Sequence, residues 1–190
     1  NLITIRSEVF RIASESLSED QILFHIRRWM EEEKSRFLVD VLENPNSSLT
    51  DLIDAISRFR FLEGEGINLS TAIEKSLRVS LIRRFLSEQL EFIKVAKNYI
   101  DISDYYDLVK RMIFPAGSHG KLGGKSAGLF LAARICATST AYKELFDKIK
   151  IPKTWYITSD GLLDFLRYNN LEGVFEQKYK EMDEIHVEYP

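Results

Sequence analysis

The pattern of apolar residues changes at residues 114–125, which read Phe-Pro-Ala-Gly-Ser-His-Gly-Lys-Leu-Gly-Gly-Lys. Four of the chain's nine glycines lie in this segment. Before it, apolar residues recur at the intervals of an amphipathic helix, and after it helical patterns enclose an aromatic and β-branched run. We therefore expect a domain boundary here, with a helical bundle domain over residues 1–113 and a second domain of mixed α/β character over 114–190.

The amino-terminal part reads as a series of helices. Ser18 and Gln21 have the spacing of a capping box, in which each side chain accepts a backbone N–H at the start of a helix. That helix should end near Asn44-Pro45-Asn46, because proline lacks the backbone donor. The pattern from Ser70 to about Asn98 carries two apolar rows and predicts one long central helix. Further helices are expected from about 49 to the break at Gly64-Glu65-Gly66, and from 103 to 113.

The carboxyl-terminal part combines helix and strand patterns. We expect helices over 126–138 and 141–150, followed by a short buried strand at Trp155–Thr158, where aromatic and β-branched residues cluster. Ser159 and Asp160 suit the cap of a following helix. A helix over about 174–182 and a strand at 186–189 are expected after it.

The composition narrows the class of protein. The 190 residues are 45% hydrophobic and 29% charged, which is typical of a globular chain and excludes a disordered one. The formal net charge of −3 argues against general nucleic-acid binding, and the clustered arginines have acidic neighbours at helical spacing. The single cysteine, Cys136, excludes an internal disulfide and a thiolate zinc site, so a reducing compartment is expected.

The ends of the chain bear on its location and completeness. No run of about 20 apolar residues and no secretory signal occurs, so we expect a cytoplasmic protein with no membrane partner. The chain starts at Asn1 rather than Met and ends on an alternating stretch. We therefore consider it a piece of a longer protein.

The candidate binding site is Gly123, Gly124 and Lys125. Glycines that open a helix allow close approach to its free N–H groups and its positive dipole end, and Lys125 adds a full charge there. The pattern is not a P-loop, because His119 stands where that motif needs its first glycine and no β-branched run precedes it. The alternative is that Lys125 is a solvated lysine after a flexible linker.

A resemblance to a known family rests on two motifs. Residues 122–129 read Leu-Gly-Gly-Lys-Ser-Ala-Gly-Leu, and residues 151–158 read Ile-Pro-Lys-Thr-Trp-Tyr-Ile-Thr, with Phe165 in the helix that follows. Together they resemble the start of the ATP-grasp nucleotide-binding domain of the pyruvate phosphate dikinase and phosphoenolpyruvate synthase family. The resemblance covers about residues 120–170, and implies a mainly α fold in which the helical bundle precedes the first α/β elements of an ATP-grasp-like lobe.

That resemblance implies an ATP-dependent phosphotransferase. Lys125 matches the family lysine that contacts the ATP phosphates, and Gly123 and Gly124 would shape the loop above the nucleotide. ATP and Mg²⁺ are the implied cofactors, and a small acceptor such as pyruvate is the implied partner. None of His25, His119 and His186 lies in the Thr-His motif of the family's phosphorylated histidine, so we assign no catalytic residue. No histidine and cysteine spacing typical of a metal site occurs either, so we assign no metal ligand. We expect this chain alone to be catalytically inactive.

A second hypothesis is a non-enzymatic helical interaction or regulatory module. In it, the helix at 70–98 is the docking surface and the glycine-rich segment is a hinge. It predicts an exposed apolar patch on the bundle and no stabilisation by nucleotide.

Overall fold

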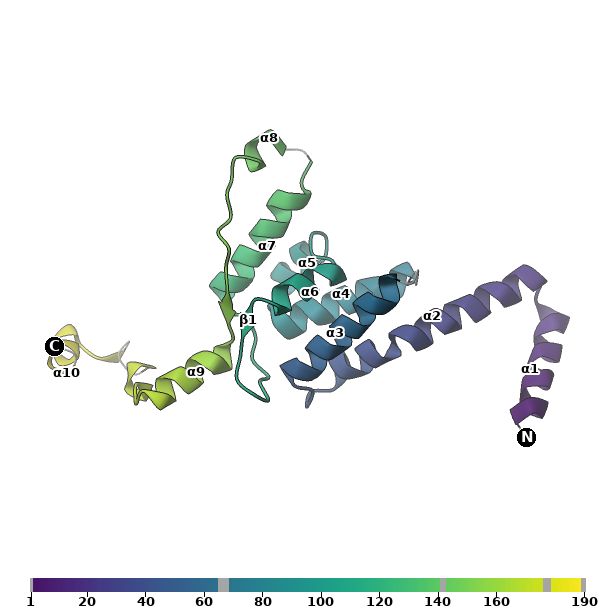
Figure 1. The fold of residues 1–190 in the computed structure, drawn as a ribbon, viewed down its shortest axis with the longest axis horizontal. Helices are drawn as coiled ribbons and strands as arrows, with labels where there is room; N and C mark the ends of the chain where they lie inside the picture. Colours follow the sequence, from purple (N-terminus) through teal and green to yellow (C-terminus); the bar gives the residue numbers. More distant parts are fainter. Residues whose placement is uncertain (1, 65–68, 141–142, 176–178, 189–190) are drawn as a thin grey trace.

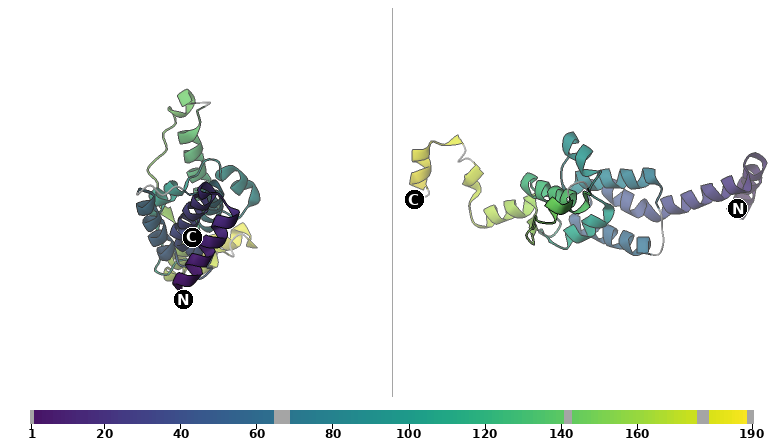
Figure 2. Two further views of the ribbon diagram at one scale, coloured as in Figure 1. Left: turned by 90° about the vertical axis from the view of Figure 1, so that its right-hand side faces the viewer. Right: turned by 90° about the horizontal axis from the view of Figure 1, so that it is seen from above.

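The computed structural model describes residues 2–64, 69–140, 143–175 and 179–188. The molecule is mainly helical, as predicted (Figure 1). A central bundle carries three extensions: α1 with the amino half of α2 at one end, α9 to α10 at the other, and α7 with α8 to one side (Figure 1 and Figure 2). Among the described residues, none of the helices combines the length and the apolarity that crossing a membrane requires.

Helices α1 (Leu2–Ser16), α2 (Glu19–Glu43) and α3 (Leu49–Gly64) form the amino-terminal part. The capping box predicted at Ser18 is present, with Ser18 and Gln21 exchanging side-chain to backbone hydrogen bonds. The end of α2 at the cap residue Asn44 also confirms the prediction. The carboxyl half of α2 packs on α3 and α4, because Leu38 of α2 and Leu52 of α3 are fully buried.

The single helix predicted over 70–98 is wrong. Instead α4 (Thr71–Phe85) ends, and α5 (Leu90–Ala96) begins after a short break. The Phe85 carbonyl accepts the backbone N–H of Leu122, at 2.9 Å, and the Ser87 hydroxyl accepts the N–H of Gln89, at 3.1 Å. At this point, a hydrogen bond to Leu122 and a hydrogen bond to the Ser87 side chain therefore take the place of the backbone hydrogen bonds of a continuous helix.

Helix α6 (Ile102–Val109) is capped by Asp101 and Asp104 and ends before the predicted limit of 113. Residues Met112–Ile113 form strand β1, which pairs in parallel with β2 (Tyr156–Ile157). The carbonyls of Arg111 and Ile113 accept the N–H groups of Tyr156 and Thr158. This long-range pairing, which the local helical pattern could not show, removes 112–113 from the helix.

Helices α7 (Gly124–Thr138) and α8 (Lys143–Phe146) connect the two strands, and α9 (Ser159–Tyr168) follows β2. Residues 141–142 of the predicted 141–150 helix lie outside the described residues. The strand predicted at Trp155–Thr158 is present at Tyr156–Ile157, and Thr158 adds an antiparallel bridge to Leu122. Its predicted burial is only partly confirmed, because Tyr156 is buried and Ile157 is exposed. An ATP-grasp-like lobe is not shown, because the strand pairing of the described residues consists of this short parallel pair and its bridge.

The last elements differ from the expectation. A 3₁₀ turn spans Glu172–Phe175 and α10 spans Met182–Glu188, so the residues at 186–188 are helical and the predicted strand there is wrong. The Glu184 carboxylate accepts the N–H of Glu181, and Asp183 lies in the first turn, an arrangement that favours a helix start. Residues 176–178 of the predicted 174–182 helix lie outside the described residues.

One cluster of buried side chains runs from Leu38 of α2 to Tyr156 of β2. Its centre is a series of aromatic contacts: Phe85 to Tyr105 at 5.5 Å between ring centroids, Tyr105 to Phe130 at 6.3 Å, and Phe130 to Tyr156 at 6.5 Å. The core therefore extends across the boundary expected at 113/114.

Candidate functional site

The glycine-rich segment is held in place by Asp160, the second residue of α9. This carboxylate bridges the loop at 118–120 and the turn at 158–161. Its donors are the Ser118 hydroxyl at 2.7 Å, the Thr158 hydroxyl at 2.5 Å, and the backbone N–H groups of His119 at 3.1 Å, Gly120 at 3.0 Å and Gly161 at 3.0 Å.

These donors set the charge state of Asp160. Partial burial disfavours the carboxylate, but the hydroxyls of Ser118 and Thr158 and the amides of Gly120 and Gly161 outweigh it and lower the pKa of Asp160 to about 2. Asp160 is therefore a permanent anion at neutral pH. Its hydrogen-bond donors among the described residues belong to the loop and the turn, so its role is to order them.

The other side of the loop is bonded to α4 and to the turn between α2 and α3. The Arg84 guanidinium donates to the carbonyls of His119, at 3.0 Å, and Ser47, at 2.8 Å. Burial lowers the pKa of Arg84, and the nearby Asp160 charge opposes that shift. The Ser47 carbonyl also accepts Nδ1–H of His119, at 3.0 Å.

Ser118, His119 and Asp160 do not form a nucleophile relay. Ser118 is buried and donates directly to Asp160, whereas the His119 ring faces Ser47. A relay requires the histidine ring between the hydroxyl and the carboxylate. The three residues therefore support the loop.

Directly after the loop, Gly123, Gly124 and Lys125 form the amino end of α7. Gly123 is the cap residue, with extended backbone angles (φ −63°, ψ 157°) and no side-chain hydrogen bond to the helix. The first backbone N–H that donates within the helix is that of Ala127, to the carbonyl of Gly123 at 2.9 Å. The N–H groups of residues 124–126 thus have no acceptor within the helix.

This end of α7 is open to solvent. A Cβ atom built on Gly123 or Gly124 would meet no heavy atom within 4 Å, and the Lys125 side chain is exposed. Lys121, four residues earlier, is instead paired with Glu88 and lowers the pKa of that carboxyl by hydrogen bonding and charge. Lys125 is therefore the cation of this segment that is accessible to an anion, and the residues fit a phosphate group.

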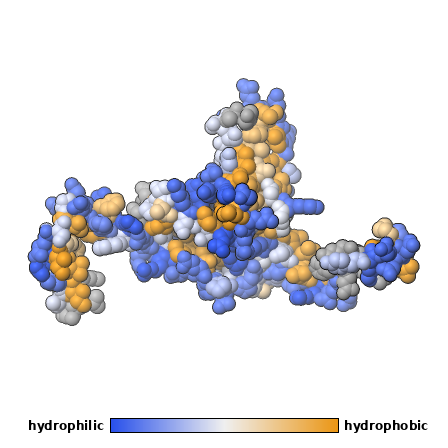
Figure 3. Space-filling model, turned by 180° about the vertical axis from the view of Figure 1, so that it is seen from behind, coloured by the Kyte–Doolittle hydropathy of each residue, from blue (hydrophilic) through white to orange (hydrophobic). Residues whose placement is uncertain are grey.

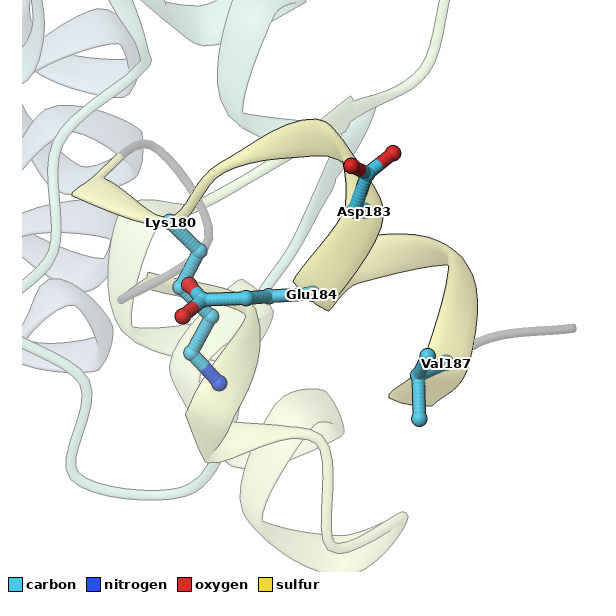
Figure 4. A pocket seen from close by; sticks show the side chains of 4 residues that line it. All are labelled: Lys180, Asp183, Glu184 and Val187. Atoms are coloured by element: carbon cyan, nitrogen blue, oxygen red, sulfur yellow. The ribbon is translucent and has the colours of Figure 1, made fainter.

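Two hollows among the described residues lie away from this end of α7. One of about 150 Å³ lies between α6, α7 and β2 and contains the Asp104–Arg134 ion pair, at 2.9 Å. Burial raises the pKa of Asp104, and Arg134 opposes the shift. A second hollow, of about 510 Å³, lies on α10, where Glu184 extends toward Lys180 and Asp183 points away (Figure 4). The first is too small for a nucleotide, and the second presents carboxylates, which repel phosphate.

The described ranges contain no cluster of side chains that could hold the expected Mg²⁺ without the nucleotide. No three histidine, cysteine or acidic side chains gather there in a way that could hold a metal ion. The described residues therefore include a candidate phosphate site and no cluster of three metal-ligating side chains.

No protein-family model matches the chain, and no match to a curated protein or to a solved structure was found. The resemblance to the dikinase family therefore rests on the sequence alone, at residues 122–129, 151–158 and Phe165.

Proposed function

We propose that the amino end of α7 binds the phosphates of ATP, and that the chain is the amino-terminal part of an ATP-dependent phosphotransferase of the pyruvate phosphate dikinase and phosphoenolpyruvate synthase kind. The observation that carries this proposal is the first turn of α7, where open Gly123 and Gly124 precede the exposed Lys125. A reducing compartment such as the cytoplasm suits its single cysteine.

The proposed role is electrostatic. Free N–H groups at a helix start and the positive end of the helix dipole attract anions, and an ammonium group strengthens the attraction. In phosphoryl transfer, cationic groups neutralise charge on the phosphates. Lys125 would supply one such charge, while the phosphate acceptor, such as pyruvate, would be bound by other parts of the enzyme.

Thermal melting with and without ATP tests the proposal. At an ATP concentration about ten times the Kd, binding stabilises the folded state by about 1.4 kcal/mol, which raises the Tm of a chain of this size by about 4 °C. We expect Lys125→Ala to abolish this rise. Lys75→Ala, which removes an exposed lysine on α4, should leave it intact.

A second variant separates binding from folding. Gly123→Asp places a carboxylate at the cap of α7, where it should accept first-turn N–H groups and add a few tenths of a kcal/mol to stability. The same carboxylate would repel phosphate. The expected result is a higher Tm without ATP and no response to ATP. An ATP-dependent rise that survives in both Lys125→Ala and Gly123→Asp contradicts the proposal.

The interaction module remains the competing proposal, favoured by one observation. The apolar rows of α4 are not available for docking, because Leu77, Leu81, Ile82 and Phe85 are buried in the core. An exposed apolar groove lies instead between α1 and α2. This proposal predicts that ATP leaves the Tm of the unmodified chain unchanged.

A further inference from the structure

Helix α1 and the amino half of α2 form an open V that projects from the central bundle and is called the α1–α2 hairpin here (Figure 1 and Figure 2). The two helices enclose a groove of about 320 Å³. Its walls are almost entirely apolar and include Val9, Phe10 and Ala13 of α1 and Ile22, Ile26 and Trp29 of α2. The space-filling view shows an apolar stripe along this projecting arm (Figure 3).

The apolar surface of the hairpin is too large for two helices to bury against each other. Six of its side chains are between 52% and 62% exposed: Ile5, Val9, Phe10, Ile12, Trp29 and Met30. Since α1 is apolar over a wide arc, its contact with α2 covers only part of it. An uncovered face of this kind is typical of an interaction surface.

The area involved suits a second copy of the chain. Half of a large apolar side chain is about 100 Å², so these six residues expose roughly 600 Å² per chain. Two copies that cover each other's hairpin would remove about 1,200 Å² from water, which is the lower limit for a stable interface. Half-buried groove residues outside these six, such as Ile22 and Ile26, add to this area.

The charges of the hairpin also suit pairing with itself. Residues 2–30 contain four basic and four acidic side chains, so their net charge is zero. Arg11 is paired with Glu8 and Glu15, at 2.6 Å and 2.5 Å, and Arg28 with Glu32, at 2.9 Å. Two identical faces would therefore meet without the repulsion that a single-sign surface produces.

We propose that two copies of the chain associate through the α1–α2 hairpin and form a four-helix bundle with two-fold symmetry. An isologous interface uses the same patch on both copies, and paired helical hairpins bury a common apolar seam. Because the hairpin lies at one end of the molecule, the two central bundles stay apart in this arrangement (Figure 1). The inference is independent of nucleotide binding.

The two tryptophans provide a matched test. Trp29 lies in the groove and Trp155 lies outside it, and they are 59% and 56% exposed. In the Trp155→Phe chain, Trp29 is the only tryptophan, and we expect its emission to shift to shorter wavelength as the concentration rises through the micromolar range. In the Trp29→Phe chain, the emission of Trp155 should stay unchanged. Light scattering should show a twofold increase in mass over the same range.

A charged substitution tests the interface itself. Phe10→Glu should raise the dimer Kd at least about tenfold, because it places a carboxylate in the apolar seam of both copies. Phe165→Glu, at a side chain of nearly equal exposure on α9, should leave the Kd unchanged, and circular dichroism should show that both variants keep their helices. A chain that stays monomeric at all concentrations overturns the proposal and leaves the groove to another partner. A dimer in which Trp29 keeps the emission of an exposed residue, or in which Phe10→Glu has no effect, overturns it as well.

Discussion

Asp160 makes the loop before α7 depend on a single carboxylate. Five hydrogen-bond donors from two segments about 40 residues apart converge on it. A carboxylate that accepts several N–H and O–H groups is stabilised in its charged form, so its pKa falls. The same donors lose their acceptor charge when the carboxyl group is protonated or replaced.

The stability of the fold should therefore depend on the ionisation of Asp160. Its folded-state pKa is about 2, below the value near 3.9 of an unfolded chain. Because the folded value is the lower one, its contribution is fully present above about pH 4 and is lost as the pH falls toward 2. After allowance for solvent screening, we expect Asp160→Asn to lower the free energy of unfolding at pH 7 by roughly 1 kcal/mol.

Urea unfolding at pH 7 and between pH 4 and pH 2 measures this effect. The unmodified chain should lose more stability on acidification than Asp160→Asn does. Asp164→Asn is the matched control, since Asp164 lies exposed on the same helix and its ion-pair contact with Arg167 is 3.9 Å long. Equal acid sensitivity in the unmodified chain and Asp160→Asn would contradict this role.

Sequence reasoning could find part of the candidate site. Gly123, Gly124 and Lys125 are neighbours in the chain, so the glycine pattern and the helix start were enough to place them together. Asp160 was predicted only as a cap residue. Its contacts with Ser118 and Gly120 require the pairing of β1 with β2, which no local pattern contains. A polar Thr-Ser-Asp-Gly turn after an aromatic strand, at 158–161, was the one available signal.

At the level of elements, two glycines near the start of α7 have opposite roles. A Cβ atom at Gly120 would overlap the Asp160 carboxylate, which is held from the other side by Thr158. A Cβ atom at Gly128, inside α7, would meet nothing within 4 Å. Gly120→Ala should therefore destabilise the fold by about 1–3 kcal/mol, and Gly128→Ala should stabilise it by about 0.5–1 kcal/mol.

Thermal or urea unfolding of the two alanine variants measures both values, and each variant serves as the control for the other. A neutral effect of Gly120→Ala would mean that the loop can move away from Asp160. In that case the loop would not fix the amino end of α7 as described above.

Helix ends that depend on neighbouring residues could be predicted from the sequence. Helix ends that depend on tertiary contacts could not. The capping box at Ser18 and the end of α2 at Asn44 depend on neighbouring residues, and both predictions are confirmed. The end of α4 depends on a hydrogen bond between Phe85 and Leu122, and the end of α6 depends on strand pairing at Met112. In both cases a continuous apolar pattern extends past the true end.

The glycine-rich segment joins two parts of the molecule that share one core. Phe130 of α7 contacts Tyr105 of the bundle and Tyr156 of β2, so buried side chains from both sides of residue 113 pack together. The change of sequence pattern at residues 114–125 therefore corresponds to the loop that positions α7. Because the parts before and after this loop share a core, we expect them to unfold together.

Unfolding of the complete chain should be a single transition if the aromatic series couples the two parts. Phe130 is 3% exposed, and Phe130→Ala should lower the free energy of unfolding by about 3–5 kcal/mol. Circular dichroism reports mainly on the bundle helices, and in the Trp29→Phe chain the fluorescence of Trp155 reports on the residue before β2. If the core is shared, both signals change at the same urea concentration, and Phe130→Ala moves both midpoints by the same amount. A variant that shifts only the Trp155 signal would instead indicate two domains that unfold separately, as the boundary expected at 113/114 predicts.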